Sequence, residues 1–287
     1  MITLHNENNG KDRHHSGLSG INTGLTKLNE VTGGWHNGAL ILLASRPGMG
    51  KTQMMIFFAK IAAIEGFPVC IYSLESSAEY ITKRLIVSSS ILPEDVLVAK
   101  SMSHSTFSEL LKETQKLSNL PIYIDDTTDF TMNYIREHAK ALKEERKCSI
   151  IFIDYLQIID FGVNANTEEQ IFTEALIQAK SISTELNVPL VLLSQLSTQV
   201  ELKGDPRPIL TDLPKYQGTE PNADIVAFLY RPEYYNIEFD SNGKSLKGYG
   251  EIIIAKNHHG RVQDIPFSYN ESMTRISDYD PRESHSL

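Results

Sequence analysis

The chain has 287 residues, of which 41% are hydrophobic, and it carries a formal net charge of −9. This length allows one large domain or two small ones with buried cores, and the acidic balance argues against a surface that is basic throughout, although not against a local basic channel. No apolar run approaches the ~18 residues that cross a membrane and no secretory segment is present, so we expect a cytoplasmic protein without a membrane partner.

The two ends of the chain are polar and its interior is not. Residues 1–16 have almost no aliphatic pattern, and we expect a flexible leader there. Residues 17–38 combine turn-forming residues with regularly placed aliphatic ones, which indicates a folded lead-in. We therefore expect one domain over residues 17–277, followed by a frayed polar tail over residues 278–287.

The most informative stretch follows an apolar run at residues 39–44 and precedes another at 54–59. It reads Ser45-Arg46-Pro47-Gly48-Met49-Gly50-Lys51-Thr52. An aliphatic strand, a glycine-containing turn that ends in Gly-Lys-Thr, and a helix together form the layout of a phosphate-binding loop. The first motif position holds Ser45, where glycine is usual.

Each residue type in this stretch suits a polyphosphate. Gly48 and Gly50 let backbone N–H groups curl around anionic oxygens. Lys51 places a cation on the outer phosphates. Thr52, in the first helical turn, offers its hydroxyl to Mg²⁺, and the positive end of the helix faces the phosphates. The stretch therefore predicts a polyphosphate ligand, with a magnesium ion at Thr52.

Polar residues end three further apolar runs. Glu75 follows a strand predicted at residues 67–74 and could polarise the attacking water, although a helix cap or a surface acid is as compatible with its position. Asp154 ends the apolar part of the strand predicted at 149–157, which we expect to neighbour the strand of the phosphate loop. An acid there supports a nucleotide-bound metal or caps a turn. Gln195 ends the strand predicted at 188–194 and could sense the terminal phosphate or be an ordinary polar strand end.

The remaining pattern alternates helices and strands. We expect helices at residues 78–90, 105–117, 131–146 and 171–186, strands at 121–126 and 225–230, a hairpin of 249–256 with 263–269, and polar loops at 164–170 and 196–222. Asp125 and Asp126 end the strand at 121–126, and capping accounts for them better than a metal site does. Cys70 and Cys148 lie in or beside apolar runs and are expected to be buried, reduced thiols. The pattern predicts one α/β domain with a doubly wound, mostly parallel sheet and a C-terminal hairpin.

Taken together, the motifs resemble the ATPase domain of the DnaB-type hexameric replicative helicases, which are RecA-like P-loop NTPases, over about residues 17–276. The matching stretches are Thr32-Gly33-Gly34, Arg46 to Thr52, Ser73-Leu74-Glu75, Ile153-Asp154-Tyr155-Leu156-Gln157, Leu193-Ser194-Gln195-Leu196, Ala223-Asp224-Ile225-Val226 and Leu229-Tyr230-Arg231-Pro232-Glu233-Tyr234-Tyr235.

The resemblance implies a ring of subunits, usually six, that binds ATP and Mg²⁺ at subunit boundaries and moves 5′ to 3′ along single-stranded DNA. It implies that Lys51 and Thr52 bind phosphate and metal, that Glu75 activates water, that Asp154 supports the metal, and that Gln195 couples the γ-phosphate to the DNA loops. It also places Arg231 and the whole of Ser45 to Thr52 in the ATP site, and it implies a primase or helicase loader as partner.

Two functional stretches depart from the family pattern. The family has Lys-Gln-Arg at the hairpin, where its arginine reaches the neighbouring subunit's γ-phosphate. This chain has Lys256-Asn257-His258, and a histidine is a conditional single donor where a guanidinium holds two oxygens. We expect Lys256, His258 and Arg261 to supply the contact to the neighbour's phosphate.

The second departure lies in the loop that contacts DNA, which the family writes Asp-Leu-Arg-Glu-Ser-Gly. Here the residues are Asp212-Leu213-Pro214-Lys215-Tyr216-Gln217. Pro214 removes a cation and a backbone donor, while Lys215 adds a charge one place later and Tyr216 can stack on a base. We expect Lys215 and Tyr216 to contact DNA.

Three functions are therefore compared. An ATP-driven helicase or single-stranded DNA translocase predicts ATPase activity that DNA stimulates. A nucleotide-binding accessory or regulator of a replication or recombination protein predicts slow hydrolysis without strand separation; Pro214, His258 and the absence of the family's N-terminal primase-interacting domain before residue 17 favour it. A recombinase or clock-type RecA relative suits the nucleotide site equally but not the stretches at 154–157 and 230–232. We favour the first.

Overall fold

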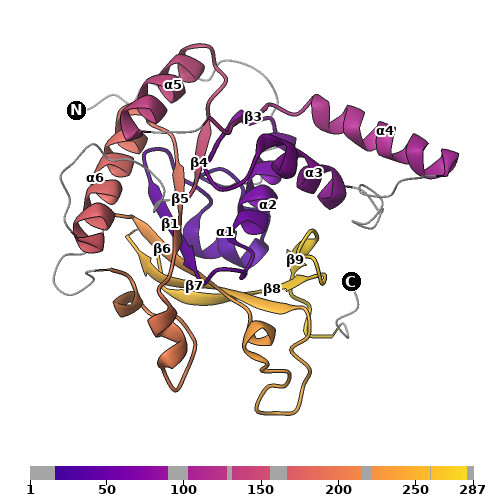
Figure 1. The fold of residues 1–287 in the computed structure, drawn as a ribbon, viewed down its shortest axis with the longest axis vertical. Helices are drawn as coiled ribbons and strands as arrows, with labels where there is room; N and C mark the ends of the chain where they lie inside the picture. The colour runs from indigo at the N-terminus through magenta and orange to yellow at the C-terminus, as the bar shows by residue number, and fades with distance from the viewer. Residues whose placement is uncertain are drawn as a thin grey trace.

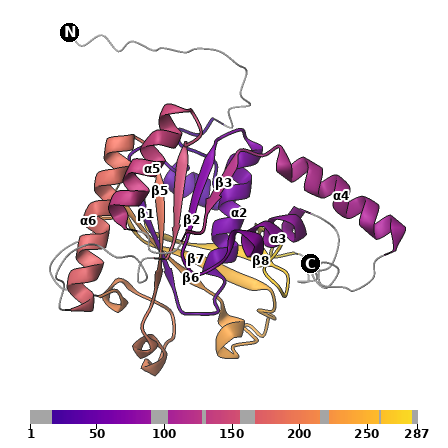
Figure 2. The same cartoon turned by 45° about the horizontal axis from the view of Figure 1, so that its top comes forward.

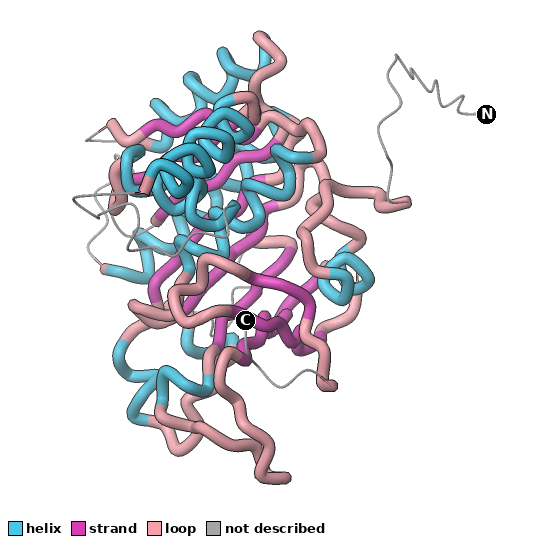
Figure 3. Tube along the Cα trace, turned by 90° about the vertical axis from the view of Figure 1, so that its right-hand side faces the viewer, coloured by secondary structure: helices cyan, strands magenta, loops and turns pink. Residues whose placement is uncertain are grey.

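The computed structural model describes residues 17–89, 103–127, 131–155, 167–214, 222–258 and 260–282. Within these ranges, nine strands form one sheet in the order β3-β2-β4-β5-β1-β6-β7-β8-β9 (Figure 1). Figure 3 shows the strands as one continuous layer through the molecule. The expected α/β sheet, mostly parallel with a C-terminal hairpin, is confirmed.

The first six strands of that order run parallel and the last three run antiparallel. The parallel strands are β3 (Ile122–Asp125), β2 (Val69–Ser73), β4 (Ile150–Asp154), β5 (Leu190–Gln195), β1 (Leu40–Ser45) and β6 (Ile225–Tyr230). The antiparallel strands are β7 (Tyr249–Asn257), β8 (Gln263–Tyr269) and β9 (Ile276–Asp278).

Helices cover both faces of the parallel strands, which is why those strands are apolar almost without interruption. The α-helices are α1 (Thr26–Thr32), α2 (Lys51–Ile64), α3 (Ala78–Ser89), α4 (His104–Ser118), α5 (Met132–Glu144) and α6 (Glu168–Leu186). Figure 2 shows α5 and α6 on one side of the strands and α2 and α3 on the other. The buried side chains accordingly form two clusters, one on each face. None of the helices in the described ranges is long and apolar enough to span a bilayer.

Local capping explains where several helices begin. The Thr131 side chain accepts a hydrogen bond from Tyr134 N, and the Thr167 side chain accepts one from Gln170 N. The polar loop expected at 164–170 is therefore wrong over its last residues, because α6 already begins at Glu168. We expected the acidic pair at 125–126 to cap the turn into the helix at 131–146; instead Asp126 accepts from Ala78 N at the start of α3, while Asp125 accepts from Thr127 N in the turn that follows β3.

The two ends of the domain meet. The expected lead-in contains α1, whose own N-cap residue Leu25 provides no side-chain hydrogen bond. The carboxylate of Asp278 instead accepts from Thr26 N at 2.8 Å. Strand β9 pairs with β8 through Asp278, and the Tyr279 ring packs on Tyr249. The frayed tail expected from residue 278 is thus wrong for these two residues, because sheet pairing and the cap hold them.

Candidate active site

The carboxyl ends of four parallel strands gather the predicted nucleotide-site residues. Ser73 of β2 lies opposite Asp154 of β4, and Ser45 of β1 lies opposite Gln195 of β5. We expected the strand of Asp154 to neighbour that of the phosphate loop, and this is wrong, because β5 lies between β4 and β1. Helix α2 bridges the distance: it packs across β1, β2, β3 and β4.

The phosphate loop joins β1 to α2 through two glycines in left-handed conformations. Gly48 has φ 74° and Gly50, the N-cap of α2, has φ 94°. A side chain at either position would be strained. Lys51 and Thr52 therefore open α2, whose N–H groups and positive dipole end point into the loop.

Helix α2 brings Thr52 to Asp154. The Thr52 hydroxyl donates to Asp154 Oδ2 at 2.8 Å. The carboxylate is fully buried, and its second oxygen, Oδ1, has no hydrogen-bond partner in the described part of the chain. A buried carboxylate oxygen without a donor is costly, and a hard cation satisfies it. Thr52 and Asp154 therefore fit Mg²⁺, which favours oxygen ligands and commonly uses one or two carboxylates together with phosphates.

The charges around this pair influence one another. Burial raises the pKa of Asp154 to about 6, with Glu75 adding to the rise, while the Thr52 hydrogen bond and Lys51 oppose it. Burial lowers the pKa of Lys51, and the carboxylates of Asp154 and Glu75 oppose that change. Glu75 itself is exposed, just beyond β2. Lys51, Asp154 and Glu75 thus lie within electrostatic reach of one another at the mouth of the loop.

Arg46 belongs to the loop by sequence, but its side chain points elsewhere. The residue is only 7% exposed. Its Nε donates to Glu201 Oε1 at 2.7 Å and its Nη1 donates to Leu196 O at 2.7 Å. Both partners lie in the segment that follows β5, so these contacts join the phosphate loop to that segment.

Residues just after β6, at the end of β8 and in the β8–β9 connection cover the loop from another side. The Arg231 guanidinium stacks 4.5 Å from the ring centre of Tyr269 and reaches Gly48 O at 3.5 Å. A Cβ at Gly48 would lie 3.3 Å from the Tyr234 ring, and a Cβ at Gly50 would overlap the Met273 sulfur. Arg231 therefore lies beside the loop, and its expected role in binding ATP stays a prediction. Sequence reasoning missed Tyr234 and Met273 as neighbours of the loop.

The residues predicted to contact a neighbouring subunit lie near the amino ends of the parallel strands, opposite the carboxyl ends that carry the phosphate loop. Strand β7 runs antiparallel to β6, so Asn257 pairs with Ile225 at the amino end of β6. His258 N donates to Asp224 O at 2.9 Å, and Asp224 accepts from Leu40 N at the start of β1. The turn that carries Lys256, His258 and Arg261 is therefore far from its own phosphate loop.

Several predicted residues lie outside the described ranges. Lys215 and Tyr216, expected to contact DNA, are among them, as are Leu156 and Gln157 of the family-like stretch. The structure therefore neither supports nor contradicts the roles expected of them. It does describe Asp212 and Pro214, which belong to the first half of the stretch expected to contact DNA.

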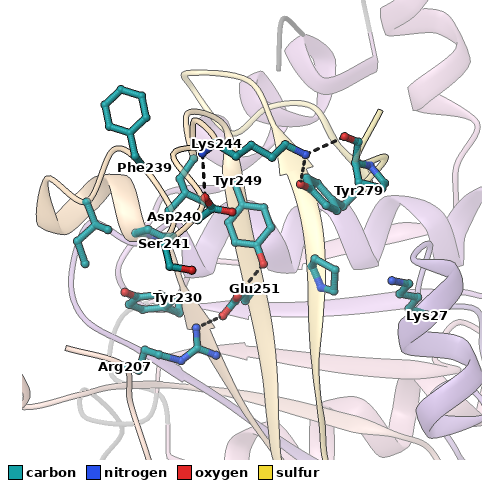
Figure 4. A pocket seen from close by; sticks show the side chains of 15 residues that line it. Lys27, Arg207, Tyr230, Phe239, Asp240, Ser241, Lys244, Tyr249, Glu251 and Tyr279 are labelled. Carbon is teal, nitrogen blue, oxygen red and sulfur yellow. Dashed lines mark hydrogen bonds and ion pairs between the residues drawn. The ribbon is translucent and has the colours of Figure 1, made fainter. Parts of the chain in front are cut away.

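A separate cavity of about 490 Å³ opens beside β6, β7 and β8 (Figure 4). Within it, Glu251 lies between Tyr249, whose hydroxyl donates at 2.6 Å, and Arg207, which forms an ion pair with it. Arg207 also pairs with Asp264 at 2.6 Å. The described residues that line this cavity include none of the predicted nucleotide-site residues, so it is distinct from the phosphate loop.

The fold and the phosphate loop define the class of protein: a RecA-like P-loop ATPase domain. A family model described as the DnaB-like helicase C terminal domain matches residues 20–278. The chain therefore belongs to the DnaB-like helicase C-terminal domain family.

Two curated relatives show how much of a longer protein the chain matches. The replicative DNA helicase DnaC of Bacillus subtilis (strain 168) and DnaB of Geobacillus stearothermophilus are each 35% identical over 267 residues, or 92% of this chain. The chain spans 58% of the length of each.

Solved structures agree with this family and fold. One solved ATPase domain has a TM-score of 0.85 at 30% identity, and the match covers 93% of this chain and 94% of that domain. A DnaB-like replicative helicase described with its interactions with primase has the same TM-score and identity, covering 92% of this chain and 62% of its own. The RadB recombinase, with a TM-score of 0.52 and 14% identity, shares the fold alone.

Proposed function

We propose that this chain is the motor domain of a DnaB-like replicative helicase, which hydrolyses ATP with Mg²⁺ to move 5′ to 3′ along single-stranded DNA. The observation that carries the proposal is the convergence of Lys51, Thr52, Asp154 and Glu75 at one mouth of the sheet. Family membership supports the direction of travel, a cytoplasmic ring of six subunits and a primase or loader partner.

Different side chains have different roles in the proposed phosphoryl transfer. The loop N–H groups and Lys51 bind the β- and γ-phosphates, and Arg231 closes the loop from the β6 side. Thr52 and Asp154 would hold a magnesium ion, which when bound would supply positive charge beside the phosphate oxygens. Glu75, exposed at the end of β2, orients the attacking water and accepts its proton. Gln195, at the end of β5, contacts the terminal phosphate.

Residues near the amino ends of the parallel strands supply the contact between subunits. Lys256, His258 and Arg261 cannot serve their own phosphate loop, because they lie beside the amino end of β6, whereas the loop leaves the carboxyl end of the parallel strand β1. In a ring, this turn reaches the nucleotide of the next subunit. His258 donates there where the family has arginine, and Arg261 supplies a guanidinium three residues later. Lys215 and Tyr216 contact the DNA backbone and bases.

The test combines mass measurement with an ATPase assay. The wild-type chain is measured by light scattering with and without ATP, and turnover is then measured with and without single-stranded DNA. We expect nucleotide-dependent assembly and turnover that DNA stimulates. If assembled protein hydrolyses ATP at the same rate with and without single-stranded DNA, the result would contradict the proposed motor function. Slow hydrolysis without strand separation would favour a nucleotide-binding accessory.

A further inference from the structure

The turn that carries His258 is attached to both β6 and α1. His258 N donates to Asp224 O at 2.9 Å, directly before β6 begins at Ile225. The Asn257 side chain donates to Val31 O, in α1, at 3.1 Å. These hydrogen bonds hold the start of the turn, so the backbone of His258 keeps a fixed place beside Asp224.

The carboxylate of Asp224 is fixed as well. Its Oδ2 accepts from Leu40 N at 2.7 Å and from Lys180 Nζ at 2.7 Å, and its side chain is 10% exposed. Burial alone would raise the pKa of Asp224, but hydrogen bonds from Lys180 and Leu40 N, together with the Lys180 charge, lower it below its ordinary value. Asp224 therefore stays an ionised acceptor, and its other oxygen, Oδ1, lies towards His258.

The His258 ring faces this carboxylate through one nitrogen. Its Nδ1 lies 3.5 Å from Asp224 Oδ1, and the side chain is 47% exposed. In a neutral imidazole one nitrogen carries a proton and the other carries a lone pair, and the hydrogen bond made by one nitrogen decides which form is present. An ionised carboxylate only accepts, so it favours the proton on Nδ1. The Nε2 atom, on the far side of the ring, then has a lone pair and cannot donate.

Other charged or titratable side chains lie on the segments around this turn. They are Lys180 of α6, Lys256 of β7, Arg261 of the turn, Lys27 and Glu30 of α1, and His36 of the α1–β1 connection. Their charges influence how readily the His258 ring takes up a proton. An acceptor beside Nδ1 has a further effect, because it also selects between the two neutral forms of the ring.

We propose that Asp224 is a positioning residue that keeps the proton of the neutral His258 ring on Nδ1, so that Nε2 donates to the neighbouring subunit's phosphate only when the ring is protonated. The inference rests on the proposed function, because it needs the contact between subunits. A proton taken from water binds the Nε2 lone pair and changes an acceptor into a charged donor. An arginine donates at any physiological pH, so the histidine makes this contact depend on pH.

Nitrogen NMR of the isotope-labelled histidine side chains tests the first part of the proposal without assembly or turnover. At about pH 8, the wild-type ring of His258 is expected to carry its proton on Nδ1. The signal is assigned by its loss in His258→Gln. In Asp224→Asn the amide can donate to Nδ1, so the form with the proton on Nε2 is expected to appear.

A matched variant controls for the change from acid to amide. Asp280→Asn removes a carboxylate that pairs with Arg282 at 2.9 Å, and it is expected to leave the His258 signal unchanged. A wild-type ring with its proton on Nε2 at about pH 8 would overturn the inference, and this result needs no variant of Asp224 to fold.

The pH dependence of turnover tests the second part. The kcat of assembled protein with single-stranded DNA is measured for His258→Arg and for the wild-type chain, and their ratio removes the pH dependence of the other groups. The ratio is expected to rise by about tenfold or more between about pH 6 and about pH 8, since only the histidine loses its charge there. With Asp224→Asn in both chains, the rise is expected to be less than about threefold, because a neutral ring can then donate through Nε2.

The outcomes separate the inference from the proposed function. A wild-type chain that neither assembles nor hydrolyses ATP would refute the proposed function and the subunit contact with it, while NMR would still show whether Asp224 fixes the proton. Assembled, DNA-stimulated protein whose ratio does not change with pH would overturn the inference alone. An equal rise of the ratio with and without Asp224→Asn would overturn the role of Asp224.

Discussion

We expect nucleotide binding to depend most directly on the cation of Lys51. It lies at the start of α2, almost buried, with Asp154 and Glu75 opposing the lowering of its pKa by burial. We expect Lys51→Ala to reduce turnover by about 100-fold or more, because a preorganised donor to the phosphates is lost. Steady-state ATPase kinetics check this. Lys27→Ala, which replaces an exposed lysine of α1, is the control and should retain wild-type turnover.

Asp154 makes stability depend on pH in a direction that is unusual for an acid. Its pKa is raised from an ordinary value of 3.8 to about 6, so the folded chain binds more protons than the unfolded chain between these values. The protonated carboxyl of Asp154 therefore stabilises the folded chain. This contribution to the free energy of unfolding is fully present below pH 3.8 and is lost as pH rises through about 6. The loss is roughly 3 kcal/mol, since each unit of pKa is about 1.4 kcal/mol.

The variant Asp154→Asn tests this effect, because its side chain carries no charge at any pH. Without metal or nucleotide, it should be more stable than the wild-type chain at about pH 7.5 and similar to it at about pH 4. Urea unfolding at both pH values measures the difference. A wild-type chain and variant whose difference does not change with pH would contradict the buried, unsatisfied carboxylate.

At the scale of elements, the β7–β8 hairpin carries the proposed contact between subunits. The His258 side chain is 47% exposed and lies 3.5 Å from Asp224 through Nδ1. We expect His258→Arg to raise the turnover of assembled protein by about tenfold or more, because a guanidinium holds two phosphate oxygens. Val262→Arg adds the same charge to the same turn and should not raise turnover. An equal response of the two variants would argue against a specific contact.

The junction of α1 with β9 is a second element-scale feature. Asp278 caps α1 by accepting from Thr26 N and from the Thr26 hydroxyl. We expect Asp278→Ala to lower the free energy of unfolding by about 1 kcal/mol, the usual effect of losing a cap. Chemical denaturation measures it, with Ser277→Ala as the neighbouring control. If both variants unfold alike, the cap contributes nothing.

The features of the structure that can be predicted from the sequence are those that depend on local patterns of residues. Alternating apolar runs and the loop motif are enough for the parallel sheet, the hairpin and the position of Lys51 and Asp154 at one edge. Strand order is not available from local pattern, which is why sequence reasoning missed the placement of β5 between β4 and β1. The contacts of Arg46 with Glu201 and of Gly50 with Met273 join residues far apart in the chain, and no spacing rule indicates them.

At the scale of the whole molecule, we expect one chain to contribute to two nucleotide sites, its own and that of a neighbouring copy. The phosphate loop opens at the carboxyl ends of the parallel strands, while Lys256, His258 and Arg261 lie near their amino ends. A complete hydrolytic site is therefore expected only where the loop of one copy meets the turn of the next.

The central claim is that the loop, Lys51, Thr52, Asp154 and Glu75 hold one nucleoside triphosphate with its metal. Calorimetric titration of the wild-type chain with ATPγS, with and without Mg²⁺, tests it most directly. We predict saturable binding that Mg²⁺ strengthens and that Lys51→Ala removes. A titration in which no nucleotide associates, or in which Asp154→Asn leaves the effect of Mg²⁺ unchanged, would contradict the account.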